Sequence, residues 1–170
     1  SFLSVLEQIV PFAPDAIGHS GDTVQNGPVL AEWQTQYFDP LAAAQSLGQR
    51  TPVLVARGNH DGGSPPALAY HWLPGNGHWY AETIGRVRFI FLESNLVTPQ
   101  QDDFLRAELA SPASQNAEFR VAVFHHPPYT KLWNQPGYDG EPHPRDVWVP
   151  ILEKYGVELI GANARAITMA

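Results

Sequence analysis

The chain has 170 residues, of which 44% are hydrophobic and 16% charged, as expected for one globular domain with a sizeable core. Its formal net charge of -7 argues against a general nucleic-acid-binding surface and against adhesion to anionic membranes, because both need basic patches. The absence of cysteine excludes disulfides and thiolate metal sites, and no apolar run approaches the ~18 residues of a membrane-spanning helix. We therefore expect neither nucleic-acid nor membrane partners.

Helical and strand patterns alternate along the chain, which predicts a partly parallel sheet with helices outside it. In the first half of the chain we expect a helix over 2–10, an apolar step ending at 21–22, a helix over 28–47 interrupted by Pro40, a strand over 52–57 and a loop over 58–78. A hairpin over 78–95 and a helix over 98–109 should follow. The last part should form a strand over 119–126, a loop over 127–144, a helix over 145–155 and a strand over 157–161. Thr98 and Gln101 form a capping-box pattern, and the charged run 100–108 is expected to be a solvated helix face.

Polar side chains follow three of these predicted strands. Asp22 ends the first apolar step, Asn59-His60 follow the strand over 52–57, and His125-His126 end the strand over 119–126. Ligands gather at the carboxyl ends of strands in such sheets, so we expect these side chains to share one edge. Carboxylate oxygen, amide oxygen and imidazole nitrogen together suit Zn, Mn or Fe. The residues alone leave open whether one metal or two would bind.

Three segments in this order, GDTVQNG (21–27), GNHD (58–61) and VFHHPPYT (123–130), resemble the calcineurin-like metallophosphoesterases, in particular their purple-acid-phosphatase-like branch. The resemblance covers residues 1–161. It implies an α/β sandwich of mixed β-sheets flanked by helices, with residues 1–170 forming a single, incomplete metallophosphoesterase-like domain. It also implies hydrolysis of a phosphorylated small molecule, as a phosphoric monoester or diester, by a metal-bound hydroxide at a dinuclear Fe, Zn or Mn site.

The resemblance makes Asp22 the carboxylate that bridges two metals, with Asn59 and His125 as ligands of the second metal. The family's earlier strand, with an Asp ligand of the first metal, has no counterpart here, and GANA (161–164) stands where the family's GHxH supplies two imidazoles. Gln25 stands where the purple enzymes have a tyrosine, so no tyrosinate colour is expected. This chain should therefore hold one weak metal site, because affinity follows ligand number and charge.

Three further residues have catalytic roles implied by the resemblance. His60 would protonate the leaving oxygen or hold the phosphate, Asp61 would orient His60, and His126 would lie beside the substrate. His19 is expected to point away from this edge, and Arg57 to form a buried structural pair.

The missing ligands leave three explanations open: segments absent from the sequence, an engineered or truncated form, or a natural descendant that has lost catalysis. Loss of a whole sheet strand should cost more than the ~5–15 kcal/mol net stability of a domain, which favours the first two. The alternative function is a catalytically inactive binding module with a degenerate metal site. Relatives of this branch are often exported, so a secreted or periplasmic location is slightly favoured.

Overall fold

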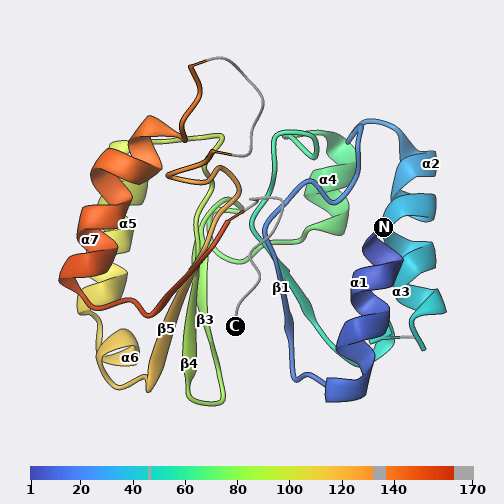
Figure 1. Ribbon diagram of the computed structural model, residues 1–170, viewed down its shortest axis with the longest axis horizontal. Helices are drawn as coiled ribbons and strands as arrows, with labels where there is room; N and C mark the ends of the chain where they lie inside the picture. The colour runs from blue at the N-terminus through green and yellow to red at the C-terminus, as the bar shows by residue number, and fades with distance from the viewer. Residues whose placement is uncertain (46, 132–136, 163–170) are drawn as a thin grey trace.

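The computed structural model describes residues 1–45, 47–131 and 137–162. Two β-sheets lie at the centre of the molecule, and helices cover the outer side of each (Figure 1). The strands are β1 (Ile17–His19), β2 (Val53–Val55), β3 (Tyr80–Ile84), β4 (Val87–Phe91), β5 (Phe119–Val123) and β6 (Leu159–Gly161). β1 and β2 are parallel; in the order β3-β4-β5-β6, β3 runs antiparallel to β4 and the other neighbours are parallel. The expected α/β sandwich is thus confirmed.

The helices divide between the two sheets along the chain, α1 to α4 beside the first and α5 to α7 beside the second (Figure 1). The α-helices are α1 (Phe2–Ile9), α2 (Leu30–Glu32), α3 (Asp39–Ala43), α4 (Pro65–Tyr70), α5 (Pro99–Ala110), α6 (Pro112–Gln115) and α7 (Val149–Lys154). There are also the 3-10 turns η1 (Val10–Phe12) and η3 (Leu47–Gln49) and the π-helical turns η2 (Trp33–Phe38) and η4 (Pro144–Trp148). Within the described part of the chain, no helix is both long and apolar enough to cross a bilayer.

The expected interruption at Pro40 is wrong. α2, η2 and α3 follow one another without a gap, and Pro40 lies in the first turn of α3. A proline ring normally collides with the carbonyl one turn earlier, and the wider π-helical turn η2 gives it room. Pro150 follows η4 in the same way at the start of α7.

Two short helices were not expected from the sequence. α4 lies inside the predicted loop over 58–78, and α6 follows α5. Both begin with Ser-Pro: the side chain of Ser64 accepts a hydrogen bond from the N–H of Ala67, and that of Ser111 from the N–H of Ser114. A serine N-cap followed by a proline at the first helical position is a recognisable helix start, so the sequence did contain the signal.

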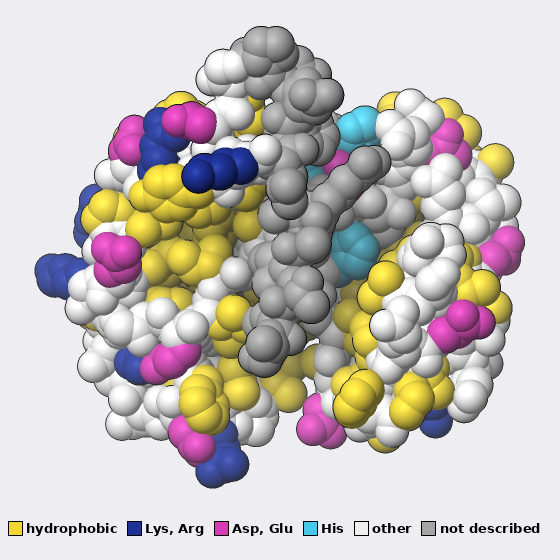
Figure 2. Space-filling model, viewed as in Figure 1, with side chains coloured by type: hydrophobic (Ala, Val, Ile, Leu, Met, Phe, Trp, Pro, Cys, Tyr) yellow, Lys and Arg dark blue, Asp and Glu magenta, His cyan; other side chains and the backbone are white. Residues whose placement is uncertain are grey.

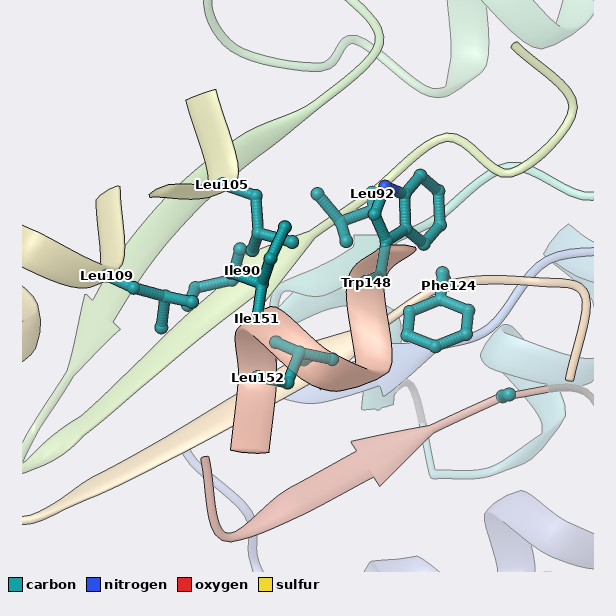
Figure 3. Close-up of a cluster of buried hydrophobic side chains, with 10 residues drawn as sticks. Ile90, Leu92, Leu105, Leu109, Phe124, Trp148, Ile151 and Leu152 are labelled. Carbon is teal, nitrogen blue, oxygen red and sulfur yellow. The ribbon is translucent and has the colours of Figure 1, made fainter. Parts of the chain in front are cut away.

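The described residues form three clusters of buried hydrophobic side chains. Side chains from α5 and α7 meet those of the second sheet in a tightly packed cluster (Figure 3), which includes Ile90, Leu92, Leu105, Leu109, Phe124, Trp148, Ile151 and Leu152. A second cluster lies under α1 to α3, and a third, formed by Ala56, Tyr80, Phe91 and Val123, joins the two sheets. The Tyr80 hydroxyl donates to the carbonyl of Val55 and accepts from its N–H, both at 3.0 Å, and so links β3 to β2.

Candidate metal centre

Asp22, Asn59 and His125 meet at one point although they follow three different strands. They lie shortly after the ends of β1, β2 and β5. Nε2 of His125 lies 2.9 Å from Oδ1 of Asn59 and 3.4 Å from Oδ2 of Asp22. Histidine side chains, cyan in Figure 2, lie along the boundary between the two halves of the molecule. The structure therefore brings the three predicted ligands together, while their binding of a metal stays a prediction.

The orientation of His125 makes this point suitable for a cation. Its Nδ1 lies 2.9 Å from the carbonyl oxygen of Ser20, so the Nδ1–H donates there. In the neutral ring, Nε2 then carries a lone pair that faces the oxygens of Asn59 and Asp22. Convergent lone pairs repel one another in the bare protein and are stabilised by a cation between them. A backbone carbonyl that fixes the ligand imidazole is also common around protein metal sites.

A close crossing of two loops fixes the position of Asp22. Gly21 and Asp22 have φ angles of 91° and 53°, in the left-handed region that favours glycine. A Cβ on Gly21 would lie 2.4 Å from the nitrogen of Gly58, and a Cβ on Gly58 would lie 2.2 Å from Oδ1 of Asp22. The backbone N–H of His60 donates to that same Oδ1 at 3.0 Å. The glycines of both motifs are therefore needed for the loops to approach each other.

The carboxylate of Asp61 clamps these two loops together. It is fully buried and accepts hydrogen bonds from the N–H groups of Thr23 (2.8 Å), Val24 (3.3 Å) and Gly58 (3.0 Å). Burial raises the pKa of Asp61, and these N–H donors oppose the rise. The expectation that Asp61 orients His60 is corrected, because its oxygens are taken up by the backbone that shapes the site.

Gln25 is the residue that holds His60. Nδ1 of His60 lies 2.8 Å from the side-chain nitrogen of Gln25 and 2.8 Å from the backbone carbonyl oxygen of Gln25. When the amide donates to Nδ1, the proton of the neutral ring resides on Nε2. When Nδ1–H instead donates to the backbone carbonyl of Gln25, the lone pair lies on Nε2, so Gln25 fixes the position of the ring but not its tautomer. In the sequence, Gln25 is notable only because it occupies the position at which the purple enzymes have a tyrosine.

His126 lies beside the three candidate ligands. Its ring centroid is 4.8 Å from that of His125. The hydroxyl of Ser94 accepts from the backbone N–H of His126 and lies 2.9 Å from Nδ1, to which it can donate. Burial lowers the pKa of His126, and neighbouring His125 lowers it further. When the Ser94 hydroxyl donates to Nδ1, the neutral ring carries its proton on Nε2, and the role of His126 beside a substrate stays a prediction.

His19 has the structural place expected of it, on the same face of β1 as the core residue Ile17 and against Phe2 of α1. Its Nδ1 accepts from the N–H of Gly21 at 3.1 Å, and its ring packs edge-on against Phe2. Burial lowers the pKa of His19 to about 4, the charge of Asp22 opposes this shift, and His125 adds to it. His19 therefore lies within electrostatic reach of the site.

The structure confirms that Arg57 forms a buried structural pair, as expected. It is 2% exposed, and its Nε lies 3.5 Å from Oε2 of Glu93. Its guanidinium also bonds the carbonyl of Gly77, and its own carbonyl accepts from the side chain of Asn95 at 3.1 Å. The buried pair ties the loop that carries Asn59 to the end of the second sheet.

Among residues 1–45, 47–131 and 137–162, no three His, Asp or Glu side chains converge as a metal site. The candidate centre instead combines one His and one Asp with the amide of Asn59. Ala162, where the resemblance expects an imidazole, is buried just after β6. Ala164 lies outside the described residues.

Comparisons with known proteins agree with this architecture. The family model for calcineurin-like phosphoesterases matches residues 1–161. Among the solved structures that match is purple acid phosphatase PPD1 from seeds of yellow lupin (Lupinus luteus), with a TM-score of 0.75 and 22% sequence identity over 94% of this chain. The match covers 32% of the lupin chain, so this chain spans about a third of that protein, and the likeness shows a shared fold. Curated protein sequences give no match.

Proposed function

Because this chain belongs to the calcineurin-like phosphoesterase family, we propose that it hydrolyses a phosphoric monoester or diester of a small molecule with the help of a bound metal ion. The observation that carries the proposal is the convergence of Asp22, Asn59 and His125, with Nε2 of His125 2.9 Å and 3.4 Å from the two side-chain oxygens. No basic surface is needed for such a substrate, since a local cation attracts the phosphate despite the net charge of -7.

In this proposal Asp22, Asn59 and His125 hold the cation, and the carbonyl of Ser20 keeps Nε2 of His125 directed at it. A divalent cation at this position supplies charge that neutralises phosphoryl oxygens and lowers the pKa of water toward ~7. Three protein ligands leave coordination positions free, as in catalytic rather than structural metal sites.

Two histidines supply hydrogen-bond donors in this proposal. His60 offers an Nε2 proton to the leaving oxygen when the side-chain amide of Gln25 donates to its Nδ1. His126, held through Nδ1 by Ser94, offers its Nε2 proton to a phosphoryl oxygen that does not leave. Donors held in place before the substrate arrives need little reorganisation during the reaction, which is the main source of electrostatic catalysis.

Substitution Asn59→Ala tests the ligand set. We expect it to lower bound Mn or Zn, measured by elemental analysis, and to lower turnover of p-nitrophenyl phosphate or bis-p-nitrophenyl phosphate by more than about tenfold. Asn116→Ala removes the same amide from an exposed position after α6 and should change neither quantity. Unchanged metal content and turnover in Asn59→Ala would exclude Asn59 as a ligand.

The buried Ala162 favours one second candidate, a binding module that keeps the fold and a weakened metal site. The same measurements distinguish the two functions. Metal-dependent turnover of either ester by the unaltered chain supports the hydrolase, whereas a bound metal without turnover of either ester supports the binding module.

A further inference from the structure

A cavity of about 330 Å³ opens between the two sheets, away from the candidate metal centre. Its walls come from β2 on one side, from β3 on the other, and from the segment that follows α4. β2 and β3 are each the last strand of their sheet, so the cavity lies where the two sheets meet without pairing. None of the three candidate metal ligands lines it. Its size is at the lower end of the ~300–1,000 Å³ typical of small-molecule sites.

The described residues that line this cavity include the aromatic side chains of Tyr37, Tyr70, Trp72 and Tyr80. Tyr37 and Tyr80 are buried, whereas Trp72 is 88% exposed at the rim. Burial raises the pKa of Tyr37 to about 12 and also raises that of Tyr80, so both phenols are neutral at physiological pH. The faces of neutral aromatic rings carry negative electrostatic potential and attract cations.

The charged and polar groups of the walls also favour a cation. Glu82 lies two residues beyond Tyr80 on the same face of β3, and its charge adds to the burial that raises the pKa of Tyr80. Among the described residues that line the cavity, none is Lys or Arg. His71 is neutral, because burial lowers its pKa to about 3.

His71, one of the lining residues, bonds Thr23 behind the cavity wall. The Thr23 hydroxyl can donate to Oδ2 of Asp61, so Nε2–H of His71 donates to Thr23 at 3.2 Å. Nδ1 of His71 then bears a lone pair, and it is buried without a hydrogen-bond partner in the described structure. Because Nδ1 has almost no accessible surface, the contacts of the cavity with a ligand come from the other lining groups.

We propose that this cavity binds a small organic cation of the alkylammonium class, with its charge between the aromatic side chains and Glu82. This site is separate from the metal centre, and the inference does not depend on the proposed hydrolase activity. Glu82 also has a simpler reading, since a charge on an edge strand opposes edge-to-edge aggregation. If that were the only role of Glu82, choline would not bind to this cavity, so a choline titration distinguishes the two roles.

The test compares choline with 3,3-dimethylbutan-1-ol, which has the same shape and hydroxyl but no charge, by isothermal titration calorimetry on the 170-residue chain. Choline should bind saturably, and the neutral analogue at least about tenfold more weakly, because only the cation gains from the ring faces and from Glu82. Equal binding of the two compounds, or no saturable binding of choline, would overturn the proposal without any variant being made.

Two variants locate the binding site. Trp72→Leu and Glu82→Gln should each weaken choline binding at least about fivefold. Their matched controls, Phe12→Leu at an 82% exposed aromatic and Glu118→Gln at a surface ion pair with Arg86, should leave it unchanged. Choline affinity that is the same in Trp72→Leu and Glu82→Gln as in the original chain would contradict the assignment to this cavity.

Discussion

At the residue scale, the candidate metal centre depends on glycines that let the loops of Asp22 and Asn59 cross closely. Gly58→Ala would place a Cβ 2.2 Å from Oδ1 and 2.3 Å from the nitrogen of Asp22, so one loop must move. We expect the free energy of unfolding, measured in urea, to fall by more than about 2 kcal/mol, with loss of bound metal. Gly18→Ala is the control, because its Cβ would have nothing within 4 Å. Equal stability of the two variants would show that the crossing is not tight.

The burial of His71 makes stability depend on pH. Its pKa falls from 6.5 to about 3 on folding, so between these values the unfolded chain binds one more proton than the folded chain. The free energy of unfolding should therefore fall as the pH is lowered from 6.5, by about 1.4 kcal/mol per pH unit from this group. His71→Gln should remove this part of the slope while keeping a donor to Thr23. Identical slopes in a pH series of urea unfolding would refute this assignment.

The sequence was sufficient to predict that Asp22, Asn59 and His125 share an edge, because each follows a strand whose pattern is clear. The partners of Asp61, Gln25 and His19 could not be predicted in the same way. These partners depend on how two loops cross after their strands end, and a left-handed residue such as Asp22 leaves no periodic pattern in the sequence.

At the element scale, Gln101 has a different role from the one its capping-box position predicts. Thr98 does accept from the N–H of Gln101, at 3.3 Å, as an N-cap should. The side chain of Gln101, however, is fully buried and bonds the N–H and carbonyl of Glu93 and the carbonyl of Leu96. It therefore anchors the loop that precedes α5.

We expect Thr98→Ala to lower the free energy of unfolding by about 1 kcal/mol, as usual for a lost N-cap. Gln101→Ala should cost about 3 kcal/mol, because it leaves several backbone groups buried without partners. Both values can be measured by urea denaturation. If Gln101→Ala lowered the free energy of unfolding less than Thr98→Ala, the side chain of Gln101 would have no anchoring role beyond capping.

The predicted solvated face of α5 is wrong in part. Asp102 accepts from Nε1 of Trp148 at 2.8 Å and lies 2.9 Å from Nε2 of His143, and Glu108 pairs with Arg88 at 2.8 Å. The hairpin of β3 and β4 and the helices α1, α5 and α7 were predictable, because their periodicity or turn residues are local. Partners supplied by distant elements, as for Asp102, are not encoded in the spacing of charges.

At the scale of the whole molecule, the Tyr80 hydroxyl is a polar link between the two sheets. Tyr80→Phe keeps the buried ring but leaves the N–H and carbonyl of Val55 without this partner. We expect a loss of about 1–3 kcal/mol in the free energy of unfolding. Tyr129→Phe, at a 61% exposed tyrosine, should change stability by less than about 0.5 kcal/mol. Equal effects of the two substitutions in urea unfolding would show that the link adds nothing.

The alternation of helices and strands was enough to predict the fold class, and the three motifs were enough to predict its family. The division of the strands between two sheets is a tertiary property: β2 and β3 are consecutive in the sequence yet belong to different sheets. Short apolar runs do not specify their pairing partners, so this boundary and the cavity beside it became visible only in three dimensions.

The clamp that Asp61 forms between the loops has a consequence for ion uptake. Since hydrogen bonds within the protein already hold Asp22 and the loop of Asn59 in place, an arriving ion does not have to fold its own binding site. Under the proposed function, a cation would therefore bind with little loss of conformational entropy, and its removal by a chelator should leave the fold intact.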